Sequence, residues 1–222
     1  MASLSKPGAV LLDLDGTLVD TVGTRIEAWL RAFGEFDVPA ERDVVAGLIG
    51  SDGKHLAREV GARAQRPVVE ELAERIDKRA GEVYSELNTD PQPLPGVTSF
   101  LDALEARGIP WAIATSSRRE QVGRSIQALG RPLEPRIVDG SSVERAKPEP
   151  DLLLAAAREL GVPPGVCWCV GDSTWDMRAA TAAGMTPIAV LAGSAVTPDE
   201  LRAAGAVDCV PRIDELIPAL SP

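Results

Sequence analysis

Ala9-Val-Leu-Leu-Asp13-Leu-Asp15-Gly16-Thr17-Leu-Val-Asp20 is an apolar run that ends in two carboxylates spaced two residues apart, followed directly by Gly and Thr. Side chains on a strand alternate with a period of two, so Asp13 and Asp15 are expected on the same side of the chain. Gly16 allows a turn just beyond them. Two adjacent carboxylates repel each other unless a cation or a shared proton relieves the repulsion. The pattern therefore suits an Asp nucleophile beside an Asp that moves protons.

The size and charge of the chain limit the number of domains that it can form and the kinds of partner that it can bind. Its 222 residues are enough for one large domain, or for a core with a modest insertion. A net charge of −10 argues against binding to nucleic acid or to anionic membranes, which need basic surfaces. No signal-peptide pattern and no apolar run of membrane-spanning length are found. We therefore expect a cytoplasmic protein without nucleic-acid or membrane partners, and a monomer or a homodimer.

The chain divides into three parts. Residues 8–20 form a strand and the acidic turn, and residues 21–90 have helical patterns, among them an amphipathic spacing from Ile26 to Phe33. A Pro-rich segment at 88–96 is a candidate hinge. A helical segment between two α/β pieces indicates a small second domain. The predicted organisation is a core at 1–19 and 93–222 with a helical domain at 20–92.

Residues 95–222 alternate between helix and strand patterns. Such alternation predicts an α/β fold, a Rossmann-like parallel sheet with helices on both faces. Ligands of such sheets bind at the carboxyl ends of the strands. Ser117-Arg-Arg-Glu120 has the pattern of a capping box at the start of one helix. The predicted strands are 109–114, 136–139, 166–170 and 187–191, and the predicted helices are 97–104, 117–130, 150–160 and 174–183.

Four polar clusters lie where predicted strands end or helices begin. They are Asp13-x-Asp15-Gly-Thr17, Thr115-Ser116-Ser117, Lys147-Pro-Glu-Pro-Asp151 and Gly171-Asp172-Ser-Thr-Trp-Asp176. This set, in this order, resembles the haloacid dehalogenase superfamily, in particular its aspartate-dependent phosphatases with a helical cap. The resemblance covers nearly the whole chain. The fourth cluster and the tail from Thr197 to Gly205 look like the phosphoglycolate-phosphatase-like branch, which is near the β-phosphoglucomutases.

The resemblance implies a role for each motif residue. Asp13 would attack phosphorus and form an aspartyl-phosphate, and Asp15 would protonate the leaving alcohol and then deprotonate the attacking water. Lys147 would neutralise charge on Asp13 and on the transferring phosphoryl group. The phosphate group itself would be held by Thr17, Thr115, Ser116 and Lys147, helped by backbone N–H groups at a helix start.

The resemblance also implies a Mg²⁺ site. The ligands would be the carboxylates of Asp13 and Asp172 and the backbone carbonyl of Asp15, with Asp176 orienting a metal-bound water or supporting the metal indirectly. Positioning and cations serve phosphoryl transfer best, so the set is chemically consistent. Asp15 must be protonated at the first step, so we expect its pKa to lie above that of Asp13.

The helical segment carries the candidates for substrate specificity. Its Gly-rich loop Ile49-Gly-Ser-Asp-Gly-Lys-His55 corresponds to a loop that contacts the leaving group in capped relatives. Ser51, Lys54 and His55 are therefore candidates, as is Arg25 on the first helix. A solvent-exposed histidine is an equally simple interpretation of His55.

The favoured function is hydrolysis of a small phosphorylated metabolite. The second aspartate, Asp15, argues against the dehalogenase branch, which lacks it. Neither Lys54 nor Lys78 has a context that indicates a Schiff-base lysine, so a phosphonoacetaldehyde hydrolase is disfavoured. Two alternatives stay open at this point: a sugar phosphomutase similar to β-phosphoglucomutase, and a non-catalytic binding protein on the same fold.

Overall fold

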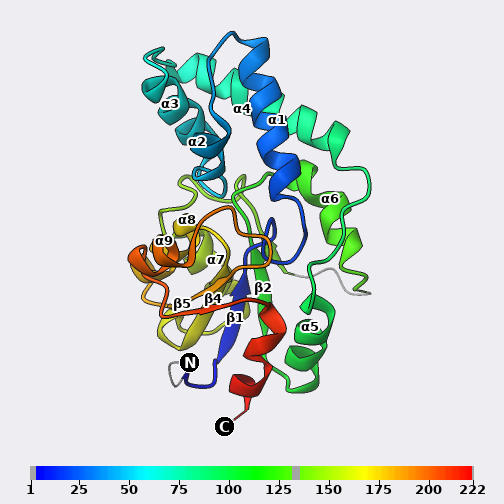
Figure 1. Cartoon of the computed structure of the whole chain (residues 1–222). Helices are drawn as coiled ribbons and strands as arrows, with labels where there is room; N and C mark the ends of the chain where they lie inside the picture. Colours follow the sequence, from blue (N-terminus) through cyan, green and yellow to red (C-terminus); the bar gives the residue numbers. More distant parts are fainter. Residues whose placement is uncertain (1–3, 132–135, 222) are drawn as a thin grey trace.

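The computed structural model describes residues 4–131 and 136–221. Within these residues the chain forms a six-stranded sheet, entirely parallel, in the order β3-β2-β1-β4-β5-β6 (Figure 1). The predicted α/β fold with a Rossmann-like sheet is confirmed. The strands are β1 (Ala9–Leu12), β2 (Trp111–Ala114), β3 (Ile137–Val138), β4 (Cys167–Gly171), β5 (Thr186–Val190) and β6 (Asp208–Val210).

Helices cover both faces of the sheet. Alternate residues of β1 point to opposite faces, so Val10 and Leu12 belong to one hydrophobic cluster and Ala9 and Leu11 to another. The first face is covered by α5 (Val97–Ala106), α6 (Arg119–Ala128) and the 3₁₀ helix η2 (Ile213–Leu220). The second face is covered by α7 (Asp151–Leu160) and α8 (Thr174–Ala182).

Three elements near the C-terminus were not anticipated: α9 (Pro198–Ala203), β6 and η2. Each is short, and β6 spans only three residues, too few for a period-two signal. The start of α9 does carry a local signal, because Thr197 and Glu200 form a capping box around Pro198.

Four helices lie between β1 and α5 in the sequence, and we call residues 22–87 the helical insert. Trp29, Phe33, Leu56 and Ile76 are among the buried residues of its own hydrophobic cluster, which Trp175 of α8 joins. Figure 1 shows the insert above the carboxyl ends of β1 and β2. The boundaries of a separate domain at residues 20 and 92 stay a prediction. The helices are α1 (Val22–Glu35), α2 (Arg42–Ala46), α3 (Gly53–Arg63) and α4 (Glu70–Leu87).

The chain enters and leaves the insert through two adjacent segments. Val19 forms an antiparallel bridge with Pro93, and the Asp20 N–H donates to the Gln92 carbonyl at 2.9 Å. The two crossings therefore lie side by side, which suits a hinge.

No helix in the described part of the chain is long and apolar enough to cross a membrane.

Candidate active site

The four sequence clusters meet at one end of the sheet, beneath the helical insert. Asp13 follows β1, Thr115 follows β2 and Asp172 follows β4, so neighbouring strands bring them together. Gly16 turns with a φ of +84°, and a Cβ at that position would lie 2.4 Å from Asp172 Oδ2. Only glycine fits this turn without displacing Asp172, as the motif predicted.

Asp13 is buried and bound to Lys147. The Lys147 ammonium lies 2.5 Å from Asp13 Oδ1 and 2.7 Å from Asp176 Oδ1, and it donates to the Ala114 carbonyl at 2.7 Å. Burial by itself would lower the pKa of Lys147, but the two carboxylates raise it above its usual value, so the ammonium stays charged. The structure thus places Lys147 against the predicted nucleophile.

Three buried carboxylates form a cluster that could hold a metal ion: one oxygen of each of Asp13, Asp172 and Asp176 lies within 4.8 Å of the others. Burial, opposed by Lys147 and reinforced by Asp176, raises the pKa of Asp13 from 3.8 to about 7. Burial and the Asp13 charge raise the pKa of Asp172 as well. Thr17 donates to Asp172 Oδ1 at 2.9 Å, so it orients this carboxylate. The three carboxylates repel one another, and the Lys147 ammonium offsets this repulsion only in part. The cluster is therefore a suitable place for a cation.

Asp15 occupies a different environment from the one we expected. Thr21 donates to its Oδ1 at 2.5 Å and Ser117 to its Oδ2 at 2.9 Å, while Arg25 NH2 lies 2.8 Å from Oδ2. Burial alone would raise the pKa of Asp15, but Arg25 and these hydrogen bonds outweigh it and lower the pKa below its ordinary value. The expected order of the Asp13 and Asp15 pKa values is therefore wrong for this arrangement, since every partner favours the ionised form of Asp15.

A polar network that the sequence did not indicate extends from Asp15 into the insert. The hydroxyl of Tyr84 on α4 donates to Asp15 Oδ1 at 3.2 Å and lies 3.2 Å from Ser125 Oγ on α6. Asn88 donates to both hydroxyl groups, at 2.8 and 3.1 Å. Tyr84 is the only tyrosine in the sequence, and its place on a strongly charged helix was the one available signal.

The hydroxyl residues after β2 have three separate partners. Thr115 Oγ1 accepts from the Ser117 N–H at 3.1 Å, and Ser116 donates to the Gly50 carbonyl of the insert at 2.9 Å. Ser117 binds Asp15 instead of capping a helix. The predicted capping box is wrong, because α6 begins at Arg119 and its N-cap, Arg118, makes no side-chain cap. Contact with Asp15, far away in sequence, overrides the local pattern.

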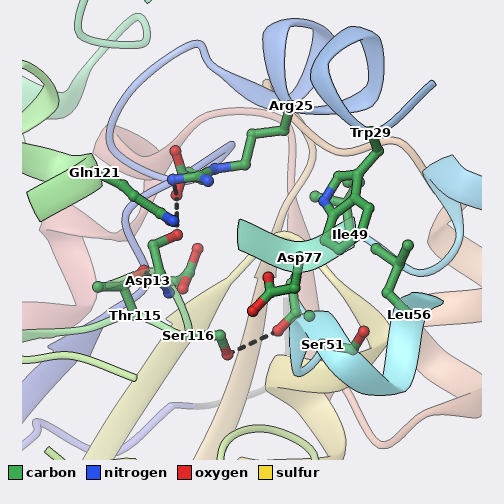
Figure 2. Close-up of a pocket in the computed structure, with 14 residues that line it drawn as sticks. Asp13, Arg25, Trp29, Ile49, Ser51, Leu56, Asp77, Thr115, Ser116 and Gln121 are labelled. Atoms are coloured by element: carbon green, nitrogen blue, oxygen red, sulfur yellow. Dashed lines mark hydrogen bonds and ion pairs between the residues drawn. The ribbon is translucent and has the colours of Figure 1, made fainter. Parts of the chain in front are cut away.

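A cavity of about 60 Å³ lies between the predicted catalytic residues and the insert (Figure 2). Of the four predicted specificity residues, Arg25 and Ser51 line it. Lys54 pairs with Glu70 on the outer side of the insert, and His55 packs edge-on against Trp175 at a ring distance of 5.3 Å. Ile49, Gly50 and Gly53 of the predicted loop also line the cavity. The sequence did not indicate the other lining residues of the insert and α6, which are Trp29, Leu56, Asp77 and Gln121.

Comparison with known proteins agrees with this geometry. The family described as haloacid dehalogenase-like hydrolase matches residues 10–190. A phosphoglycolate phosphatase of Cupriavidus necator is 34% identical, over 100% of this chain and 97% of that protein. A β-phosphoglucomutase of Bacillus subtilis is 30% identical, over 82% of each. A much longer curated relative also matches, and the aligned region spans only 18% of its length.

A solved structure supports the same assignment. A hydrolase from Pseudomonas syringae is 30% identical, superposes with a TM-score of 0.89, and covers 96% of this chain and 97% of that one. The chain belongs to the haloacid dehalogenase-like hydrolases, in the branch of the phosphoglycolate phosphatases and β-phosphoglucomutases.

Proposed function

We propose that this protein is a Mg²⁺-dependent phosphatase that hydrolyses a small phosphomonoester through an aspartyl-phosphate on Asp13. The observation that carries the proposal is the position of Asp13. Its carboxylate lines the cavity, beside the Lys147 ammonium and within a cluster of carboxylates suited to a cation. This is the arrangement that an oxygen nucleophile for phosphorus requires.

The residues of the chain would act in two steps. An Asp13 oxygen forms a bond to phosphorus while the ester P–O bond breaks. Asp15 is ionised in the absence of substrate, so it would take up a proton as the anionic substrate binds and pass that proton to the leaving oxygen. Asp15 then takes a proton from a water that attacks the phosphoryl group, which releases phosphate and restores Asp13. Lys147 offsets negative charge on Asp13 throughout, and Thr115 with Ser116 holds phosphoryl oxygens.

The donor set fits Mg²⁺. All candidate ligand atoms are oxygen, and Mg²⁺ needs only one or two carboxylates because it keeps several waters. Asp13, Asp172 and the Asp15 backbone carbonyl would hold it. Asp176 is already bound to Lys147 and to the Ser173 N–H, so it would support the site from outside. When bound, the ion would act as a Lewis acid on a phosphoryl oxygen.

The cavity size favours a phosphatase over a sugar phosphomutase. A cavity of about 60 Å³ has room for roughly four to six water-sized sites, enough for a phosphoryl group and a few further atoms. A hexose phosphate would need the insert to move away. The phosphomutase stays the second candidate because of the B. subtilis relative. A non-catalytic protein would have no need for the complete set of motif residues.

We also propose that residues 20–92 form a cap domain that closes over bound substrate and excludes water, with its hinge at the paired crossings. Three cap–core contacts support closure. Gly50 O accepts from Ser116, the Asp52 N–H donates to Lys147 O at 3.2 Å, and Trp175 Nε1 donates to Gly47 O at 3.1 Å.

The test is phosphate release from a panel of small phosphomonoesters and an aryl phosphate, with Mg²⁺ and with a chelator. We expect Asp13→Asn to reduce release below detection, since the amide is a poor nucleophile. Asp20→Asn is the matched control: it lies in the same motif, is exposed, and should keep the wild-type rate. Circular dichroism checks that both variants fold.

Two results would contradict the proposal. Full activity in Asp13→Asn would remove the nucleophile assignment. Isomerisation of a sugar phosphate in place of net phosphate release would support the phosphomutase.

A further inference from the structure

Two side chains of the insert and two from outside it hold the carboxylate of Asp15. Ser117 donates to Oδ2 at 2.9 Å, and Thr21, just before α1, donates to Oδ1 at 2.5 Å. From the insert, Arg25 NH2 lies 2.8 Å from Oδ2 and the Tyr84 hydroxyl donates to Oδ1 at 3.2 Å. Each oxygen thus has one partner from the insert, so the direction in which Asp15 faces depends on where the insert lies.

The two partners from the insert brace each other. The guanidinium carbon of Arg25 lies 3.6 Å from the centre of the Tyr84 ring, and such a cation is attracted to the ring face, most strongly where water is excluded. Tyr84 is 1% exposed, and the side chain of Arg25 is 11% exposed. Figure 2 shows Arg25 extended from α1 toward the cavity. The stacked pair therefore reaches Asp15 as one unit from α1 and α4.

The hydroxyl of Tyr84 is itself held from behind. Asn88 Nδ2 donates to Tyr84 Oη at 2.8 Å and to Ser125 Oγ at 3.1 Å, and the two hydroxyl oxygens lie 3.2 Å apart. Ionised Asp15 can only accept, so the hydrogen of Tyr84 points to Oδ1 and the hydrogen of Ser125 points to Tyr84. All three side chains are buried, and every hydrogen of this network has an acceptor.

The core fixes the end of α4 that carries this network. In Figure 1 the C-terminal end of α4 lies beside α6. Arg124 of α6 donates to the carbonyls of Ser85 and Asn88 at 2.8 and 3.1 Å. The last turn of α4 has no basic residue of its own, so Arg124 supplies the positive charge that a helix C-terminus favours. Tyr84 is therefore attached to α6 through the backbone of α4 as well as through Ser125.

We propose that Tyr84 is a positioning residue for proton transfer: its hydroxyl, braced by Asn88 and Ser125, fixes the direction in which Asp15 presents its carboxyl group to the leaving oxygen. This inference rests on the proposed function, in which Asp15 passes a proton to that oxygen.

Two observations exclude a direct role for Tyr84 in the reaction. Among the described residues, the side chains that line the cavity of about 60 Å³ do not include Tyr84, so it does not touch the substrate. Burial and the charge of Asp15 raise the pKa of Tyr84 to about 12, so its hydroxyl keeps its proton and is not the acid. Tyr84 acts through Asp15.

A purely structural role would be to satisfy buried hydroxyl groups. In that case loss of the Tyr84 hydroxyl would slow every substrate by one factor. A residue that aims the acid affects instead those substrates whose leaving group needs a proton. 4-Nitrophenolate leaves as a stable anion, whereas phenolate is more basic and gains more from a proton donor. The ratio of kcat/KM for 4-nitrophenyl phosphate to kcat/KM for phenyl phosphate therefore separates the two roles.

The experiment measures phosphate release from these two compounds with Mg²⁺, for the wild type, Tyr84→Phe, Asp15→Asn and the double variant. Tyr84→Phe removes only the hydroxyl and keeps the ring on which Arg25 lies. Ser85→Ala is the matched control, because Ser85 is the next residue of α4, is exposed, and its hydroxyl donates to the Gly81 carbonyl of its own helix. Circular dichroism checks that the variants fold.

We expect Tyr84→Phe to raise the ratio about tenfold through a loss on phenyl phosphate, which is a part of the roughly 10²- to 10⁴-fold that general acid–base assistance contributes. Asp15→Asn should raise the ratio further. In the double variant, Tyr84→Phe should add nothing to the ratio, because the group that Tyr84 positions is gone. Ser85→Ala should keep the wild-type ratio.

An unchanged ratio in Tyr84→Phe would overturn the inference, and so would an equal rise when Asp15 is already Asn. Both results leave the proposed function standing, since the wild type still releases phosphate. No release from any phosphate would overturn the proposed function itself. If Tyr84→Phe does not fold, Asn88→Ala decides, because it frees the Tyr84 hydroxyl and should raise the ratio in the same direction. An unchanged ratio in that variant would again overturn the inference.

Discussion

Lys147 supplies an ammonium group to buried carboxylates, with Asp13 and Asp176 both within 2.7 Å of its Nζ. An isolated ammonium would be strongly disfavoured at this depth, and so would the carboxylates without it. Each charge is tolerable only because the others are present. Loss of Lys147 therefore affects folding as well as phosphoryl transfer.

Replacement of Lys147 by Met tests this dependence. We expect Lys147→Met to lower the free energy of unfolding by about 3 kcal/mol at pH 8, because it leaves buried carboxylates uncompensated. The loss should be smaller at pH 5, where Asp13 can take up a proton. Urea unfolding followed by circular dichroism measures both values.

The control is Lys54→Met, which removes an exposed ion pair with Glu70. Exposed pairs contribute about 1 kcal/mol or less, so this variant should change stability little at either pH. A Lys147→Met protein as stable as the Lys54→Met protein would show that Lys147 does not balance buried charge.

The connection between α2 and α3 is one of the elements that join the insert to the predicted catalytic residues. Gly50 has a φ of +92°, and a Cβ there would lie 2.7 Å from Ser173 Oγ and 3.1 Å from Ser173 Cβ. Its carbonyl accepts from Ser116, and Ser51 lines the cavity. This part of the Gly-rich loop thus depends on a backbone that a larger residue cannot adopt without strain.

Gly50→Ala should therefore lower kcat/KM for phosphate release by about tenfold, since a residue forced into a left-handed conformation costs about 1–3 kcal/mol and the closed state bears this cost. Gly47→Ala, in the same connection, should leave kcat/KM unchanged. Gly47 has a φ of −67°, and the nearest neighbour of an added Cβ would be 3.7 Å away. Equal kinetics for the two variants would mean that closure of this loop is not needed.

At the scale of the whole molecule, folding itself creates the acidic cluster. Asp13, Asp172 and Asp176 come from two strand ends and a helix start, and they meet only when the sheet forms. In the unfolded chain the pKa values of Asp13 and Asp172 return to ordinary ones. The stability of the metal-free protein must therefore depend on pH through these groups.

The sign of this dependence follows from the raised pKa of Asp13. Between pH 3.8 and about 7 the folded state keeps a proton that the unfolded state has lost, so stability falls as the pH rises through this window. The raised pKa of Asp172 likewise makes stability fall as the pH rises. The lowered pKa of Asp15 has the opposite effect, because the stability that this group contributes is lost only when the pH becomes more acidic.

The measurement is urea unfolding at pH 5 and pH 8 with a chelator, for the wild type and for Asp13→Asn, which cannot titrate at this position. We expect the stability of the wild type relative to the variant to fall by about 2–3 kcal/mol between these pH values. Mg²⁺ should restore wild-type stability more strongly at pH 8 than at pH 5, because protons compete with the metal. A pH-independent difference would contradict the raised pKa.

Much of the fold and of the candidate site could be predicted from local sequence patterns. Apolar runs that end in Asp13, Thr115 and Asp172 mark strands of a parallel sheet, and parallel strands bring their carboxyl ends to one edge. Gly16 and Gly161 adopt the positive φ values that turns and helix ends require. These patterns predict that the acidic residues gather at one edge of the sheet, and the resemblance of the four motifs to a known superfamily adds the expected roles of Asp13 and Lys147.

Tertiary contacts decided the surroundings of Asp15 and the lining of the cavity, because these contacts join residues that no local pattern connects. Ser117 binds Asp15, 102 residues away, where the sequence predicts a helix cap. Tyr84 reaches Asp15 across 69 residues, and Arg25 stacks on Tyr84. The ionisation of Asp15 and the shape of the cavity depend on how the insert packs over the sheet. The sequence by itself determined which polar side chains gather at the carboxyl ends of the strands, and only the packing of the insert decided which side chains face them across the cavity.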